Sequence, residues 1–269
     1  MTGTDAWLGR KRFVDAGGAR IAYVEFEGAG PPLLLLHGFT DSSRSFSLIT
    51  SQLAGRRLII ADLPGHGGSA PGHDGWTPAD LARQMSAFMT ALDMEPAVLV
   101  GHSLGSMVAI ELAATRPGAF AGLVLLAATL QPELADDHPV VVGVNALRDP
   151  IDPNAPFFEL WHHCHPGVPE TFLARLAEEA AAMPAHRWRA ILQALRDCDL
   201  TEQASRIDMP VLIISGADDD LFSKAHHEAL AAAFPDAVAM RLADCGHNPH
   251  WDSPKRVAAA ITQAFPATV

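Results

Sequence analysis

The feature that most constrains this chain is a Gly-x-Ser-x-Gly motif at residues 101–105. An apolar run at residues 98–100 precedes the motif, and small and apolar residues at 106–114 follow it with helical spacing. This pattern predicts a buried strand, a sharp turn and a helix, with Ser103 on the turn. Glycine on either side leaves room for the turn, because a side chain there would crowd the neighbouring strand or helix. The turn would expose the Ser103 hydroxyl beside the backbone N–H groups that begin the helix, which suits nucleophilic chemistry.

Short apolar runs, typical of strands buried on both faces, recur along the chain and alternate with segments of helical periodicity. The expected strands are 32–36, 57–61, 122–127, 210–216 and a weaker 237–242, and the expected helices include 43–53, 78–92 and 255–265. Two β-prone runs, 12–16 and 20–26, flank a Gly-Gly pair and predict a hairpin. The chain is therefore predicted to be an α/β protein with a mostly parallel central sheet flanked by helices.

The alternation of strands and helices is interrupted between residues 131 and 206. No convincing buried strand occurs there, and residues 170–183 and 184–197 have the pattern of amphipathic helices. This interval predicts a helical cap inserted between two strands of the sheet. The expected organisation is a core domain of residues 1–130 and 207–269, with a cap, or lid, of residues 131–206.

The composition narrows the classes of partner. A formal net charge of -12 argues against nucleic acid or anionic membrane surfaces, which would repel the protein. No apolar run approaches the roughly 18–20 residues that cross a bilayer, and the first residues lack a signal-peptide pattern, so a cytoplasmic protein is expected. The cysteines Cys164, Cys198 and Cys245 have no C-x-x-C spacing, which predicts neither a disulfide framework nor a cysteine zinc site.

Candidate catalytic residues follow three of the predicted strands, at the carboxyl ends where open α/β sheets build their sites. Ser103 follows one strand, the aspartates at 218–220 follow the strand 210–216, and His247 follows the last strand. A serine hydroxyl needs a histidine to remove its proton and a buried carboxylate to orient the imidazole. The order serine, aspartate, histidine thus predicts a catalytic triad, with three aspartates open as its acid.

Taken together, the motifs resemble the α/β-hydrolase superfamily, in particular its small capped esterase and C–C hydrolase-like members. The resemblance covers nearly the whole chain and implies the α/β-hydrolase fold, with neither a metal nor an organic cofactor. It is carried by His-Gly-Phe at 37–39, Asp-Leu-Pro-Gly-His-Gly-Gly-Ser at 62–69, Gly-His-Ser-Leu-Gly at 101–105, Gly-Ala-Asp-Asp at 216–219 and Gly-His at 246–247.

The resemblance also implies roles for individual residues. It assigns Ser103 as the nucleophile and His247 as the base. The oxyanion of the tetrahedral intermediate would be bound by the backbone N–H groups of Phe39 and Leu104.

In the family pattern, the catalytic acid stands three residues after the glycine that ends its strand. This spacing selects Asp219 and leaves Asp218 and Asp220 as lesser candidates. Glu133, which follows the preceding strand, is an outside alternative for the acid.

Several aromatic and histidine side chains are candidates for the substrate pocket. Phe157, Phe158 and Trp161 in the cap either face the site or pack the cap onto the sheet. His102, beside the predicted nucleophile, and Trp251, after the predicted base, are further candidates.

The histidines and cysteine of residues 162–165, and the pair His247-x-x-His250, suggest a metal site at first sight. Adjacent ligands on a short segment rarely converge on one ion without acidic partners at helical spacing. His247 is also required by the triad. No metal site is therefore predicted.

These observations predict a serine hydrolase (a carboxylic ester hydrolase) that cleaves small, fairly apolar esters or lactones through an acyl-enzyme. Trp251-Asp252 and the cap also resemble C–C bond hydrolases of ring-fission products, although the loop after residue 38 lacks their usual Gly-Pro-Gly. Epoxide hydrolases and dehalogenases have an aspartate in place of Ser103, so their chemistry is disfavoured. A ligand receptor that keeps a triad but has little turnover is the alternative from another class.

Overall fold

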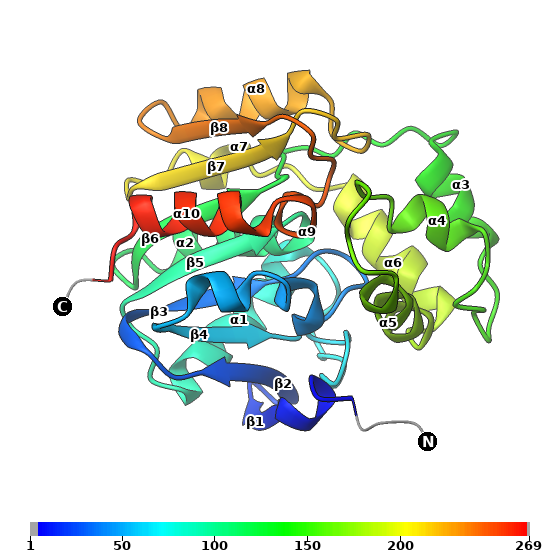
Figure 1. The fold of residues 1–269 in the computed structure, drawn as a ribbon, viewed down its shortest axis with the longest axis horizontal. Helices are drawn as coiled ribbons and strands as arrows, with labels where there is room; N and C mark the ends of the chain where they lie inside the picture. Colours follow the sequence, from blue (N-terminus) through cyan, green and yellow to red (C-terminus); the bar gives the residue numbers. More distant parts are fainter. Residues whose placement is uncertain (1–4, 268–269) are drawn as a thin grey trace.

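The structure, a computed structural model, describes residues 5–267. Its eight strands form one sheet in the order β1-β2-β4-β3-β5-β6-β7-β8 (Figure 1). The strands β1 and β2 form the predicted hairpin, β2 pairs with β4 antiparallel, and every pairing from β4 to β8 is parallel. The predicted α/β fold with a mostly parallel sheet is therefore confirmed. The strands are β1 (Arg12–Ala16), β2 (Ala19–Phe26), β3 (Ala29–Leu36), β4 (Arg56–Ala61), β5 (Ala97–His102), β6 (Phe120–Leu126), β7 (Val211–Gly216) and β8 (Val238–Leu242).

Helices cover both faces of the sheet. Each face has its own apolar core, and β3 contributes to both, because Leu34 and Leu36 pack on one side and Leu33 and Leu35 on the other. This two-sided burial explains the continuous apolar run in the sequence. One core is covered by α1 (Pro78–Ala91), α2 (Leu104–Thr115) and α8 (Lys224–Ala233), and the other by α10 (Pro254–Ala264) and the short 3₁₀ helices η2 (Ser43–Phe46) and η3 (Thr50–Leu53).

The single helix predicted over residues 43–53 is wrong, because two 3₁₀ turns, η2 and η3, form there instead. The Ser42 side chain accepts a hydrogen bond from the N–H of Arg44, and the N–H of Ser43 donates to the buried carboxylate of Asp62 at 2.7 Å. Such polar side chains compete with the regular hydrogen bonds of an α-helix. Two further short helices, η1 (Leu8–Arg10) and α9 (Pro249–Asp252), complete the part of the fold outside the 131–206 interval.

Most of the helices between β6 and β7 lie beyond one end of the sheet, on the right of Figure 1, whereas the short last one, α7, packs on α2 beside the sheet. The two amphipathic segments predicted from the sequence form α5 and α6. The division of the chain into core and cap domains at residues 131 and 206 stays a prediction. The helices are α3 (Pro139–Ala146), α4 (Phe157–Trp161), α5 (Glu170–Ala181), α6 (Ala185–Arg196) and α7 (Thr201–Ala204). Across residues 5–267, no helix has the length and apolar character needed to cross a membrane.

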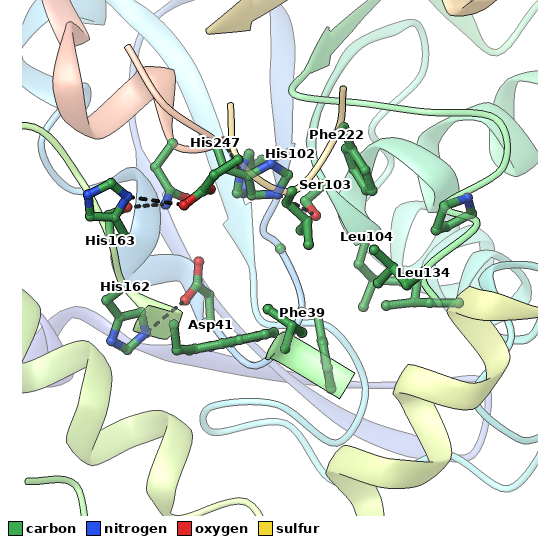
Figure 2. A pocket seen from close by; sticks show the side chains of 18 of the residues that line it. Phe39, Asp41, His102, Ser103, Leu104, Leu134, His162, His163, Phe222 and His247 are labelled. Atoms are coloured by element: carbon green, nitrogen blue, oxygen red, sulfur yellow. Dashed lines mark hydrogen bonds and ion pairs between the residues drawn. The ribbon is translucent and has the colours of Figure 1, made fainter. Parts of the chain in front are cut away.

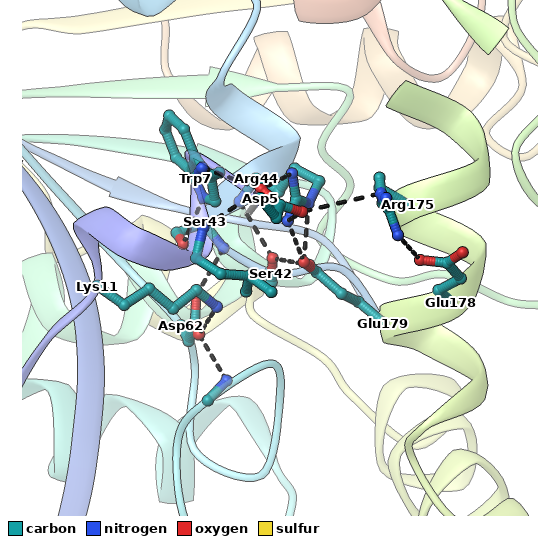
Figure 3. Close-up of polar contacts among 12 residues, drawn as sticks. Asp5, Trp7, Lys11, Ser42, Ser43, Arg44, Asp62, Arg175, Glu178 and Glu179 are labelled. Atoms are coloured by element: carbon teal, nitrogen blue, oxygen red, sulfur yellow. Dashed lines mark hydrogen bonds and ion pairs between the residues drawn. The ribbon is translucent and has the colours of Figure 1, made fainter. Parts of the chain in front are cut away.

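A buried ion-pair network joins α5 to the loop that follows β3 (Figure 3). The guanidinium of Arg44 donates through Nε to Glu179 Oε1 at 2.7 Å, and through Nη2 to Asp5 Oδ2 at 2.7 Å. Ser42 Oγ also donates to Glu179. Because the Arg44 side chain is only 8% exposed, this network is largely shielded from solvent and fixes α5 against the sheet end.

Candidate active site

Ser103 lies on the turn between β5 and α2 in a left-handed backbone conformation, with φ 49° and ψ -118°. A residue other than glycine adopts such a conformation only where the surrounding structure enforces it. Here the N–H of Ser103 donates to the carbonyl of Leu126 at 3.0 Å. A Cβ at Gly105 would lie 2.0 Å from the carbonyl oxygen of Leu36, so only glycine lets α2 pack this closely on β3. The backbone thus forms the sharp strand–turn–helix that the motif predicts.

The structure brings together the three residues predicted as a triad. Ser103 Oγ lies 3.0 Å from His247 Nε2, as Figure 2 shows for these two side chains. His247 Nδ1 lies 3.1 Å from each carboxylate oxygen of Asp219. Ser103 follows β5, Asp219 follows β7 and His247 follows β8. Together they form one continuous hydrogen-bonded chain.

Asp219 is buried and heavily hydrogen-bonded, with 1% of its side chain exposed. Its Oδ1 accepts the backbone N–H groups of Leu221 at 3.0 Å and Phe222 at 2.9 Å, and its Oδ2 lies 3.3 Å from His227 Nε2. Burial alone raises the pKa of this carboxyl. The charge of His247 and the hydrogen bonds from these neighbours outweigh burial and hold the pKa of Asp219 well below its ordinary value. Asp219 is therefore a fixed anion beside His247.

The other acids considered for this role have different surroundings. Asp218 and Asp220 are more than half exposed and face His165 at 3.4 Å and His163 at 3.2 Å. The Glu133 side chain is 70% exposed. Among the described residues, none of these three acids makes a hydrogen bond to His247, whereas Asp219 does.

Two opposing effects act on the imidazole of His247. Burial lowers its pKa, whereas the charge and hydrogen bond of Asp219, with the charges of Asp220 and Asp41, raise it, and the net pKa lies above the ordinary value. The carbonyl of His247 accepts a hydrogen bond from His102 Nε2 at 2.9 Å. Burial lowers the pKa of His102 to about 3, so His102 is neutral and Nε2 carries its proton.

Two backbone N–H groups beside Ser103 are available to a ligand. Leu104 is the first residue of α2, so its N–H has no acceptor within the helix. The N–H of Phe39, in the loop after β3, has no hydrogen-bond acceptor within residues 5–267. Both residues line the same cavity as Ser103, which is compatible with the oxyanion role predicted for them.

A cavity of about 310 Å³ opens onto Ser103 and His247. Its walls differ in character on the two sides of Ser103 (Figure 2). On one side lie the apolar side chains of Leu104, Leu134 and Phe222. On the other side lie the polar side chains of Asp41, His162 and His163. A volume of this size suits a small organic substrate.

The residues predicted for the substrate pocket differ in their position relative to this cavity. His102, Trp161 and Trp251 line the cavity. Phe157 and Phe158 do not, and their assignment to the pocket is wrong. The ring of Phe157 stacks on Trp161 at 5.7 Å, since residues four apart share one face of α4, and Phe158 packs edge-on against Trp188. Both phenylalanines support the pocket wall from behind.

The histidines at 162–165 diverge toward separate partners. His162 points toward Asp41, while His163 and His165 face Asp220 and Asp218. Across residues 5–267, no group of three metal-ligating side chains is placed to hold an ion. The sequence analysis missed Asp41, and the one signal that could have found it is its position two residues after Phe39.

Comparison with known proteins identifies the family. Residues 31–254 match the family described as the alpha/beta hydrolase fold. The chain belongs to the α/β-hydrolase family. A pimeloyl-[acyl-carrier protein] methyl ester esterase of Stenotrophomonas maltophilia (strain K279a) is 31% identical over 261 residues, which cover 89% of this chain and 94% of that protein. Among solved structures, a hydrolase from Pseudomonas aeruginosa PA01 has a TM-score of 0.80 at 25% identity and covers 96% of this chain and 99% of its own.

The enol-lactonase from Burkholderia xenovorans LB400 shares the fold, with a TM-score of 0.77 at 20% identity over 94% of this chain and 99% of its own. These comparisons confirm the predicted superfamily and fold. They also confirm the predicted enzyme class, a carboxylic ester hydrolase of the α/β-hydrolase family.

Proposed function

We propose that this α/β-hydrolase cleaves small, fairly apolar carboxylic esters or lactones, with Ser103 as nucleophile, His247 as general base and Asp219 as the acid that orients His247. The observation that carries the proposal is the hydrogen-bonded chain from Asp219 through His247 to Ser103, which ends in a cavity with one apolar side.

In the first half of the reaction, Ser103 Oγ attacks the carbonyl carbon of the ester and His247 Nε2 takes the hydroxyl proton. The Asp219 carboxylate accepts a hydrogen bond from the Nδ1–H of His247, which leaves Nε2 unprotonated and directed at Ser103. The negative oxygen that develops is bound by the N–H groups of Phe39 and Leu104. Loss of one such donor typically costs about 3 kcal/mol of transition-state stabilisation.

In the second half, His247 donates its proton to the leaving alkoxide oxygen, and the alcohol departs. A water molecule then attacks the acyl group on Ser103 and gives its proton to His247. The tetrahedral intermediate collapses, the carboxylic acid leaves and the Ser103 hydroxyl is restored. An open ester and a lactone present the same acyl carbon, so one mechanism serves both.

The size of the substrate follows from the cavity. A volume of about 310 Å³ is at the lower end for organic ligands, which favours a short acyl chain or a small ring. The similarity to a pimeloyl-[acyl-carrier protein] methyl ester esterase supports an ester of a small alcohol as the bond that is cleaved.

A panel of chromogenic esters, lactones and ring-fission dienones tests the proposal, together with a fluorophosphonate probe. We expect ester or lactone turnover and probe labelling in the wild type, and in Ser103→Ala the loss of labelling and a fall in kcat of at least about 10³-fold. Persistent labelling of Ser103→Ala contradicts the assignment of the nucleophile. Cleavage of dienones without esters reassigns the enzyme to C–C bonds, and tight ligand binding with very slow turnover reassigns it to a receptor.

A further inference from the structure

The polar side of the cavity contains a buried carboxyl and a buried imidazole that the proposed mechanism does not use. Asp41 lies two residues after Phe39 in the loop that follows β3, and His162 follows α4. Both side chains line the cavity, although no more than 5% of either is exposed. Figure 2 shows them facing each other beside the cavity, on the side of Ser103 opposite to Leu134 and Phe222.

The pair is incompletely hydrogen-bonded. Asp41 Oδ2 accepts a hydrogen bond from Ser45 Oγ at 2.9 Å. Asp41 Oδ1 lies 3.8 Å from His162 Nε2, which is too far for a hydrogen bond. His162 Nε2 is buried and has no hydrogen-bond partner among residues 5–267. An unpartnered buried nitrogen is unfavourable, so a polar group of a ligand at this position would be stabilising.

The geometry of the gap selects a hydroxyl group. An oxygen about 2.8 Å from both atoms would lie about 2 Å to one side of the line that joins them, within reach of the cavity. A hydroxyl both donates and accepts, so it can donate to the carboxylate of Asp41 and accept from the Nε2–H of His162. Burial lowers the pKa of His162 to about 3, so its imidazole is neutral and offers one N–H.

Charged ligand groups fit this gap less well. The Asp41 carboxylate would repel a substrate carboxylate at this position. Burial raises the pKa of Asp41 to about 7. A hydroxyl is the group that can pair with this side chain in either protonation state, because it donates to the carboxylate and accepts from the acid.

We propose that Asp41 and His162 form a subsite for a hydroxyl group, so that the preferred substrates are hydroxylated esters or lactones. Their apolar part lies against the side formed by Leu134 and Phe222, and their hydroxylated part lies on the Asp41 side. This inference rests on the ester hydrolysis proposed above and names the class of substrate within it.

Matched pairs of esters test the subsite. One pair is methyl butyrate and methyl 3-hydroxybutyrate, with the hydroxyl on the acid; the other is propyl butyrate and 2-hydroxyethyl butyrate, with the hydroxyl on the alcohol. The measured quantity is the ratio of kcat/KM within a pair, hydroxylated over plain. We expect the wild type to favour the hydroxylated member of at least one pair by about tenfold, the size typical of a hydrogen bond to a polar site.

The variants separate recognition from a structural effect. His162→Leu and Asp41→Leu should each lower the ratio about tenfold, whereas His162→Gln, which keeps a polar nitrogen or oxygen near the same place, should retain most of it. His186→Leu is the matched control, because His186 is an exposed histidine on α6 outside the cavity lining. It should keep the wild-type ratio.

Equal kcat/KM for both members of each pair in the wild type would overturn the subsite. So would variants at Asp41 or His162 that lower kcat/KM of both members by the same factor, since the ratio would then be unchanged. Absence of all ester turnover, or turnover that survives Ser103→Ala, contradicts the proposed function instead. Calorimetric affinities of Ser103→Ala for the same pairs give the comparison without turnover. There, a tighter hydroxylated ligand supports the subsite and equal affinities overturn it.

Discussion

Replacing Asp219 by asparagine is a sharp test of the proposed triad, because the surroundings of this side chain dictate how an amide must be oriented. The N–H groups of Leu221 and Phe222 both donate to Oδ1, so the amide oxygen has to take that position. The NH₂ group then occupies the position of Oδ2, which lies 3.1 Å from His247 Nδ1. Because His247 Nδ1 lies 3.1 Å from both positions, the NH₂ group replaces one of its two acceptors by a donor, which favours the tautomer with the proton on Nε2, facing Ser103.

In this tautomer, His247 is unable to take the proton of Ser103, and the imidazolium that forms during attack lacks a counter-charge. We expect Asp219→Asn to lower kcat by about 10⁴-fold, which corresponds to about 5.4 kcal/mol of activation free energy. Asp219 does not line the cavity, so KM should change by less than about threefold.

The pH profile gives a second readout. His247 acts as a base only when neutral, so kcat/KM rises with pH through the pKa of His247, which lies above the ordinary histidine value in the wild type. Asp219 raises that pKa, so in Asp219→Asn the rise should move to lower pH. Initial rates of the best ester between about pH 5 and 9 measure both effects.

Asp218→Asn is the matched control, because Asp218 is an exposed neighbour that faces His165 and lies outside the cavity lining. Its activity should stay within about threefold of the wild type. Residual activity above about a tenth of the wild-type value in Asp219→Asn would refute the reasoning, since a reversed tautomer allows no such rate. An equal loss of activity in Asp218→Asn would show that a disturbed loop conformation, rather than loss of the carboxylate beside His247, causes the effect.

Two further substitutions test the scaffold. Arg44→Met leaves the Glu179 carboxylate without its buried cation, which should lower the free energy of unfolding by about 3 kcal/mol. In a thermal melt, Tm should fall by about 6–12 °C, and an unchanged Tm would contradict the role of this ion pair. Gly105→Ala places a Cβ 2.0 Å from the Leu36 carbonyl oxygen, so ester turnover per soluble protein should fall at least about 100-fold. Gly9→Ala, with nothing within 4 Å of its Cβ, should leave activity and Tm unchanged, and equal behaviour of the two glycine variants would refute the packing argument.

The sheet was predictable because its signal is local. In β3, alternate leucines face opposite cores, so all four had to be apolar, and the sequence shows this directly. The turn at Ser103 was also predictable from a local signal, because Gly105 is required where the backbones of α2 and β3 lie close together. The 3₁₀ turns at 43–53 were missed because they depend on Asp62, which lies far away in the sequence and accepts the N–H of Ser43.

The site was less predictable wherever it depends on contacts between distant segments. Three consecutive aspartates follow β7, and only the turn that aims two backbone N–H groups at Asp219 distinguishes it from its exposed neighbours. The family pattern supplied that choice in advance, whereas spacing alone left it open. Phe157 and Phe158 were misplaced because the orientation of α4 about its own axis is set by packing on Trp161 and Trp188, which no local pattern encodes.

The loop after β3 connects the chemistry to the helices above the sheet. It supplies the proposed oxyanion donor, the N–H of Phe39, and Asp41, the carboxyl proposed to bind a substrate hydroxyl. Between them, Thr40 has a left-handed backbone with φ 69°, and its Oγ1 accepts the indole N–H of Trp161 from α4 at 2.8 Å. Such a conformation costs on the order of 1 kcal/mol or more unless its surroundings hold it.

The ring of Trp161 also packs edge-on against Phe39, with centroids 5.3 Å apart. Farther along the same loop, Arg44 is bound to Glu179 on α5. The loop that carries the proposed oxyanion donor is therefore held by two helices of the 131–206 interval as well as by the sheet. In the proposed mechanism, substrate selection by these helices and stabilisation of the transition state by the loop are therefore coupled, and we expect a shift of α4 or α5 to change both.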